Sequence, residues 1–171
     1  TTPPRFLVLP ALAPLPAATV VRPLALIERM GTGYDESTEE IEGPVEALLG
    51  TVGPDSIDAT TPVGVWSERK WMDPVTENPA VGATEVWEIF NTTGDAHPMH
   101  VHEVTFEVVD REGLALDGDD VVVPFQLDGV VTPPEPWETG RKDTVIAYPG
   151  QVTRIRAQFN TPGQYVWHCH I

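Results

Sequence analysis

The sequence has little cysteine and no long hydrophobic run, and each shortage narrows the kinds of protein it can encode. Cys169 is the only cysteine in 171 residues, so no disulfide can form within the chain. Cysteine pairing therefore gives no information about the redox compartment. No apolar stretch approaches the ~20 residues that a membrane-spanning helix needs, so we expect no membrane partner. The single cysteine has to be explained by its neighbours.

Positive charge is also scarce. Ten Lys and Arg residues stand against 26 Asp and Glu, which gives a formal net charge of -16. Nucleic acid and anionic membrane surfaces would be repelled by such a chain, so neither is an expected partner. Hydrophobic residues make up 41% of the sequence. A chain of this length and composition can bury the core of one ordinary domain.

No segment shows a sustained helical period. Residues 1–19 are proline-rich and are predicted to be a linker or interdomain segment, and residues 20–171 to be one domain. Inside the domain, short alternating stretches separated by turn residues predict an all-β antiparallel sandwich or barrel. The predicted strands cover residues 20–28, 64–68, 84–91, 100–110, 152–159 and 163–170. Residues 46–50 ("EALLG") are predicted to form a helical turn or part of the acidic loop before them.

All five histidines fall into two tight groups. His97, His100 and His102 lie in "HPMHVH", and the others flank the cysteine in "HCH" as His168 and His170. Imidazole is the commonest protein metal ligand, and a neighbouring thiolate favours softer ions such as copper or zinc. The grouping therefore predicts metal binding.

Strand geometry separates these ligands, because successive side chains on a strand point to opposite faces. In the first group, His100 and His102 are expected on the inward face shared with Val104, Phe106 and Val108. His97 precedes a proline, which favours an extended backbone and predicts a position in the entering turn.

In the second group, Cys169 shares a face with Tyr165 and Trp167, whereas His168 and His170 share the other face. The cysteine is thus expected to serve one centre and its neighbours a second. Two centres joined by a few covalent bonds suit electron transfer through a redox metal.

Cys169 with an imidazole from the other group, for which His97 is the natural candidate, predicts a trigonal blue copper site. Zinc remains an alternative, since four nitrogen or sulfur ligands also fit it. The CxxC and HxxxH spacings typical of zinc sites do not occur in the sequence.

At this point the sequence resembles a known family. "HPMHVH" followed by "HCHI", and the run "WMDPVTENPAVGATEVWEIFNTTGDAHPMHVHEVTFEVVDR", are similar to the C-terminal copper motifs of multicopper oxidases. The bacterial three-domain type, which includes spore-coat laccase, bilirubin oxidase and phenoxazinone synthase, is especially similar. The resemblance covers residues 69–171 and implies a cupredoxin domain, which is a Greek-key β-sandwich.

The resemblance also implies roles for the ligands, with no catalytic residues beyond them. His97 and Cys169 match type 1 copper ligands, His100 matches a type 2 ligand, and His102, His168 and His170 match ligands of the type 3 pair. A complete enzyme of this kind holds four copper ions. The family continues beyond "HCHI" to another histidine and an axial residue, and draws further histidine pairs from its N-terminal domain. This chain is thus expected to be the C-terminal domain, ending just after the motif, with about half the ligands.

The implied activity is the one-electron oxidation of phenolic, aminophenolic or bilirubin-like substrates, coupled to reduction of dioxygen to water. The implied partners are dioxygen, a small aromatic reducing substrate and the remaining cupredoxin domains, and the family favours an extracellular or cell-surface location. Two alternatives stay open from the residues themselves. One is a stand-alone copper-binding or electron-transfer module, and the other is an interaction sandwich with an incidental metal.

Overall fold

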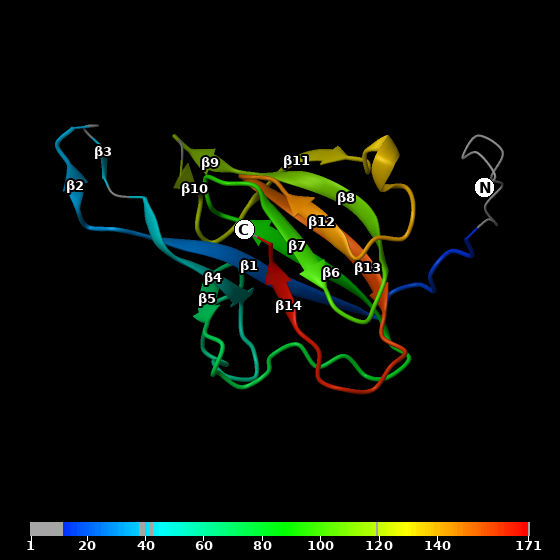
Figure 1. The fold of residues 1–171 in the computed structure, drawn as a ribbon. Coiled ribbons are helices and arrows are strands. Elements are labelled where there is room, and N and C mark those ends of the chain that lie inside the picture. Colours follow the sequence, from blue (N-terminus) through cyan, green and yellow to red (C-terminus); the bar gives the residue numbers. More distant parts are fainter. Residues whose placement is uncertain (1–11, 38–39, 42, 119, 171) are drawn as a thin grey trace, which may run out of the picture.

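The computed structural model describes residues 12–37, 40–41, 43–118 and 120–170, and it is built almost wholly from strands (Figure 1). In chain order the strands are β1 (Val20–Met30), β2 (Tyr34–Asp35), β3 (Glu40–Ile41), β4 (Pro44–Val52), β5 (Trp66–Arg69), β6 (Thr84–Asn91), β7 (His97–Val101), β8 (Phe106–Leu114), β9 (Leu116–Asp117), β10 (Asp120–Val121), β11 (Leu127–Thr132), β12 (Thr144–Ala147), β13 (Gln151–Gln158) and β14 (Trp167–Cys169). A short 3-10 turn, η2, covers Pro136–Glu138. The all-β prediction is confirmed. No helix among the described residues is long and apolar enough to cross a bilayer.

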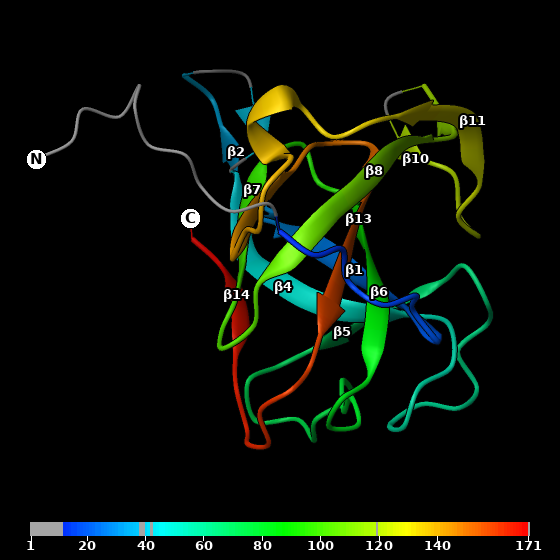
Figure 2. The same ribbon diagram turned by 90° about the vertical axis from the view of Figure 1, so that its right-hand side faces the viewer.

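Two sheets face each other across the main core. One has seven strands in the order β11-β8-β13-β6-β1-β4-β5, and the other has three in the order β12-β7-β14. Figure 2 shows β7 and β14 on one side and β8, β13, β6 and β1 on the other. The core between them contains Leu24, Leu26, Trp87, Ile89, Met99, Val101, Phe106, Ile155 and Ala147. This is the layered β-sandwich that the cupredoxin-like prediction required.

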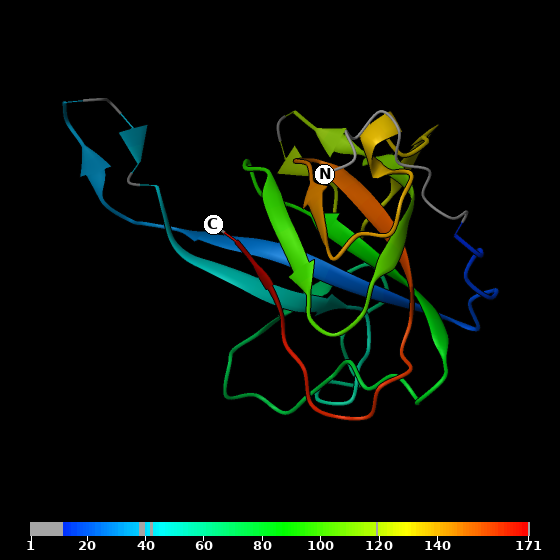
Figure 3. The same ribbon diagram turned by 45° about the vertical axis from the view of Figure 1, so that its right-hand side comes forward.

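A second apolar cluster covers the other face of the seven-stranded sheet. It contains Ala25, Ile27, Val52, Phe90, Leu114 and Val152. Because side chains alternate along a strand, neighbouring residues of β1 enter different clusters. This is why four consecutive residues of that strand, 24–27, are all buried. Beyond the sandwich, β1 and β4 continue together as an extended arm toward the β2–β3 ribbon (Figure 3).

The prediction for residues 46–50 was wrong. They lie inside β4, which pairs with β1 in an antiparallel register that includes Leu26 opposite Leu49 and Ile27 opposite Leu48. Helix propensity is a weak prior that tertiary pairing overrides, and β1 supplies a partner strand for the backbone here.

The predicted strand over residues 100–110 is in fact two strands in different sheets. β7 ends at Val101 and β8 begins at Phe106. Between them Glu103 has a φ of 65°, in the left-handed region, and turns the chain. The alternation of Val104 and Phe106 therefore cannot be extended back to the histidines.

The predicted inward face of His100 and His102 was consequently wrong. His97, Met99 and Val101 point into the core from β7, whereas His100 is half-buried and His102 is exposed on the open face of the small sheet.

The predicted strand over residues 152–159 corresponds to β13, and its predicted inward face is confirmed. Ile155 and Ala157 are buried as expected, and Phe159, partly buried, stacks on Trp87.

The predicted boundary between an interdomain segment, residues 1–19, and the domain, residues 20–171, falls near the start of the chain. Residues 1–11 lie outside the described residues, residues 12–18 have no regular secondary structure, and β1 begins at Val20. The division stays a prediction.

Candidate metal centre

Pairing of β7 with β14 brings the two histidine groups together. The strands are antiparallel, with His168 opposite His100 and Cys169 opposite Met99. On its other edge β7 pairs with β12, which places Thr144 opposite His100 and Ala147 opposite His97. The central position of β7 thus gives each candidate ligand within these strands a paired neighbour that is distant in sequence: His97, His100, His168 and Cys169.

Four histidines gather on the open face of the small sheet, and we call them the four-histidine cluster: His100, His102, His168 and His170. Ring centroids lie 4.7 Å apart for His100 and His102, and 4.8 Å apart for His168 and His170. Three ring nitrogens, one from each of His100, His102 and His168, lie within 4.8 Å of one another. An all-nitrogen donor set at this spacing suits copper or zinc, and not magnesium or calcium.

Hydrogen bonds select which nitrogen faces the cluster. Nδ1 of His100 lies 2.9 Å from the carbonyl oxygen of Asp143 and 3.1 Å from Oγ1 of Thr144. Nδ1 of His168 lies 3.0 Å from the carbonyl oxygen of Cys169. A carbonyl only accepts, so both Nδ1 atoms carry the proton and both Nε2 atoms keep a lone pair for a metal.

Within the cluster, Nε2 of His102 and Nε2 of His168 approach to 3.0 Å. Because Nδ1 of His168 carries the proton, its Nε2 accepts this hydrogen bond from Nε2–H of His102. A metal ion bound by both would replace that contact.

Cys169 lies with His97 on the opposite side of β14. Its Sγ is 3.4 Å from Nδ1 of His97, and its side chain packs against the main core. His97 is only 5% exposed and begins β7, rather than lying in the turn before it. The structure therefore separates the candidate ligands into the Cys169–His97 pair and the four-histidine cluster, along the division that strand alternation predicted for residues 168–170.

The donors fit the two kinds of site expected from the sequence. The sulfur of Cys169, which is partly buried, and the imidazole of His97 form a soft donor pair suited to copper. All the remaining histidines of the chain belong to the four-histidine cluster. Ile171 lies outside the described residues, so the description of the Cys169–His97 pair extends to His170.

Sequence reasoning missed the residues that hold these ligands. Nε2 of His97 lies 2.7 Å from Oγ1 of Thr93 and 3.5 Å from Oε1 of Glu28. The backbone carbonyl oxygen of Asp143 orients His100. Every residue has such an oxygen, so the residue type at position 143 does not predict this contact. "NTTGD" before the first histidine is rich in turn residues, and a turn was the only signal it carried.

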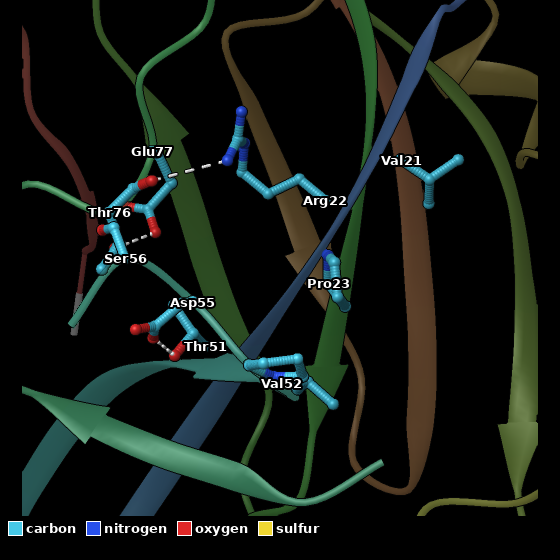
Figure 4. A pocket seen from close by; sticks show the side chains of 10 residues that line it. Val21, Arg22, Pro23, Thr51, Val52, Asp55, Ser56, Thr76 and Glu77 are labelled. Carbon is cyan, nitrogen blue, oxygen red and sulfur yellow. Dashed lines mark hydrogen bonds between the residues drawn. The ribbon is translucent and has the colours of Figure 1, made fainter. Parts of the chain in front are cut away.

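A pocket of about 230 Å³ is lined by residues that include Arg22, Asp55 and Glu77 (Figure 4). Two of its charged groups already have partners: Asp55 accepts hydrogen bonds from Thr51 and Arg69, and Arg22 pairs with Glu85 at 2.9 Å. No candidate ligand among the histidines or Cys169 lines it. It is therefore not the candidate site.

Comparison with known proteins shows the family of this chain. A family model described as multicopper oxidase matches residues 51–171. The laccase of Bacillus subtilis (strain 168) is 45% identical over 111 residues, which cover 64% of this chain and 22% of that protein. The laccase of Bacillus stratosphericus is 43% identical over 111 residues, with the same two coverages of 64% and 22%. This chain thus spans about a fifth of the length of these relatives.

Solved structures support the fold. A multicopper oxidase from Campylobacter jejuni, described as a metallo-oxidase, superimposes with a TM-score of 0.58 at 19% identity. The superposition covers 94% of this chain and 28% of that one. A laccase from Pediococcus acidilactici gives a TM-score of 0.51 at 24% identity, covering 98% of this chain and 27% of the other. At these identities the likeness concerns the fold alone.

Proposed function

The chain belongs to the multicopper oxidase family, and from this premise we propose that it supplies copper ligands to two linked centres of a laccase-like oxidase. In this proposal residues 20–171 form the C-terminal cupredoxin domain of that oxidase, and residues 1–19 are its interdomain segment. Further cupredoxin domains supply the ligands that this chain lacks.

The proposed roles follow the two groups of side chains. His97 and Cys169 would hold a type 1 copper, His100 a type 2 copper, and His102, His168 and His170 the type 3 pair, with four copper ions in the complete enzyme. The observation that carries the proposal is the division at β14. Cys169 lies 3.4 Å from His97 on one side, and His168 lies 3.0 Å from His102 on the other.

Copper bound at these residues would supply one-electron chemistry, so that a small aromatic reductant is oxidised at the first centre while dioxygen is reduced to water at the second. The chain contributes a short covalent connection, because Cys169 is bonded directly to His168 and His170. It contributes a dry environment at His97, which is buried against the core. It also contributes orientation at His100, whose Nδ1–H donates to a carbonyl and turns Nε2 toward the cluster.

Phenolic, aminophenolic or bilirubin-like molecules are the proposed reductants. The support is similarity to proteins named laccase, of which this chain spans about a fifth. The proposed substrate class thus rests on these relatives and not on the shape of a cavity.

The test uses the full-length protein, loaded with copper and freed of excess metal. We expect a thiolate-to-copper absorption band, copper signals of more than one kind in electron paramagnetic resonance, and oxygen uptake with a dimethoxyphenol. A protein with the thiolate band that consumes no oxygen with any of the three reductant classes would be an electron-transfer module, and the oxidase proposal would fail. A protein that binds zinc and forms no thiolate–copper band would refute the copper assignment itself.

A further inference from the structure

We propose that Thr93 and Asn91 are positioning residues that hold His97 in one tautomer, with the proton on Nε2 and the Nδ1 lone pair turned toward Cys169. The inference rests on the proposed function for its purpose, but the hydrogen bonds that carry it are made among the chain's own residues. It adds two residues, neither of them a metal ligand, to the machinery of the Cys169–His97 pair.

The chain of hydrogen bonds starts at Asn91, which is fully buried at the end of β6. Its Nδ2 lies 2.7 Å from the carbonyl oxygen of Asp95 and 3.0 Å from that of Ala147. Both partners are acceptors, so the amide nitrogen must be the group that faces them. Oδ1 therefore points the other way, where it accepts from the backbone N–H of Thr93 at 2.9 Å.

Thr93 continues the chain. Its Oγ1 lies 2.8 Å from Oδ1 of Asn91 and 3.2 Å from the carbonyl oxygen of Asp95. The hydroxyl has one proton, and these two oxygens can only accept it. If Thr93 instead donated its hydroxyl proton to His97, Oγ1 would face the oxygens of Asn91 and Asp95 with no hydrogen between them. Thr93 therefore accepts from His97, and its Oγ1 also accepts from the backbone N–H of Asp95 at 3.3 Å.

His97 is the end of the chain. Its Nε2 lies 2.7 Å from Oγ1 of Thr93, so Nε2 carries the proton and donates it. Oε1 of Glu28, at 3.5 Å from the same nitrogen, is a second oxygen that favours a proton there. A neutral imidazole has one proton, so Nδ1 keeps its lone pair, and Nδ1 is the atom that lies 3.4 Å from Sγ of Cys169.

Burial protects the hydrogen bonds between Asn91, Thr93 and His97 from competition by water. Asn91, Thr93 and His97 are 0%, 8% and 5% exposed, so water does not compete for these groups. The network also ties together the two sheets, because Asn91 belongs to β6 and its partner Ala147 to β12. The nitrogen and sulfur donors are thus pre-oriented before any metal arrives, which is how partners behind the ligands raise metal affinity.

The test compares Thr93→Val, which removes the hydroxyl and keeps the shape, with Thr93→Ser, which restores it. Thr92→Val is the matched control, because Thr92 is the next residue and its hydroxyl donates to the carbonyl of Leu26 at 2.8 Å, away from His97. The full-length protein is labelled with nitrogen-15 histidine, and the His97 signals are assigned with a His97→Gln variant. Ring nitrogen spectra of the metal-free protein then report the tautomer directly.

We expect the Nε2–H tautomer of His97 in the wild type, in Thr93→Ser and in Thr92→Val, and a mixture of tautomers in Thr93→Val. Copper affinity at the thiolate site should fall about 10–100-fold in Thr93→Val only. A wild-type His97 protonated on Nδ1 overturns the proposal, and so does a Thr93→Val protein that keeps the single Nε2–H tautomer. If Thr93→Val does not fold, the wild-type spectrum decides between support and refutation.

Failure of the proposed function would look different. In that case the wild-type protein forms no thiolate–copper band at any copper concentration, whatever its His97 tautomer. The nitrogen spectra of the metal-free protein would still show whether the network sets that tautomer.

Discussion

His100 and His168 lie directly opposite each other across the antiparallel β7–β14 pair, with ring centroids 5.5 Å apart. Each ring turns Nδ1 to a backbone carbonyl, one belonging to Asp143 and the other to Cys169. Two strands that are far apart in the sequence therefore present two Nε2 lone pairs to one region. The arrangement is specified by backbone pairing, so single ligands can be replaced without moving their neighbours.

Replacing His168 with Asn should empty the four-histidine cluster of copper and reduce oxygen uptake to the level of the copper-free protein. The thiolate band should persist, because Cys169 points to the other side of β14, toward His97. Copper content by mass spectrometry, visible absorption and oxygen uptake are the three measurements. Tyr165→Phe is the control on the same segment, since its hydroxyl donates only to the carbonyl of Pro162 on the surface. Loss of the thiolate band in His168→Asn would show that the two sites are not separable.

Replacing Cys169 with Ser should do the reverse. The near-isosteric side chain keeps the packing but loses the soft thiolate, so the thiolate-to-copper absorption should disappear while the four-histidine cluster still binds copper. Electron paramagnetic resonance on the copper-loaded variant distinguishes the two sites. An intense visible band that survives the substitution would mean that another group binds the first copper.

The ion pair of Arg111 and Glu138 should dominate the stability of the loop that precedes β12. Both side chains are buried and their two contacts measure 2.7 and 2.8 Å. Glu138→Gln leaves the Arg111 charge without a counter-ion, and we expect the free energy of unfolding to fall by about 3–5 kcal/mol. Chemical unfolding of the metal-free protein measures the change.

Glu46→Gln is the matched control for that substitution. Glu46 pairs with Arg29 at 3.2 Å on the surface, and exposed pairs contribute about 0–1 kcal/mol. Equal losses in the two variants would contradict a special role for the buried pair.

Acid should destabilise the fold through carboxylates that are held ionised. A hydrogen bond from Arg111 lowers the pKa of Glu138. Burial raises the pKa of Asp55, but hydrogen bonds from Thr51, Arg69 and neighbouring backbone groups outweigh it, so that pKa is also lowered. Stability from a lowered pKa is fully present above the unfolded-state value of about 4 and is lost as the pH falls through the folded-state value.

The free energy of unfolding should therefore decline between pH 5 and pH 3, as extrapolated from urea curves taken at a series of pH values. Asp55→Asn should show a shallower decline than the wild type, because one ionisation is removed. Parallel declines in the two proteins would mean that Asp55 has the same pKa in the folded and unfolded chains.

Some of this architecture follows from local pattern. Alternation along β13 correctly predicted the burial of Ile155 and Ala157. The same rule placed Cys169 on one side of β14 and His168 on the other. Both inferences used only the two-residue period of a strand, which does not depend on what the strand packs against.

The same rule failed where a strand was assumed to continue. The turn at Glu103 separates β7 from β8, and the strand rule carried across it gave the wrong face for His100 and His102. β4 was missed because the residues "EALLG" carry no strand pattern of their own, and their conformation comes from pairing with β1.

By itself the sequence determined the ligand chemistry: five histidines in two groups, a single cysteine between two of them, and opposite faces for adjacent ligands. Only the tertiary structure decided which groups meet. Pairing of β7 with β14 and β12 created the four-histidine cluster, and the buried contact with Thr93 selected the nitrogen that His97 turns toward Cys169. The physical reason is that side-chain alternation is a local property of the backbone, whereas strand partners and hydrogen-bond partners are chosen by packing between segments distant in sequence.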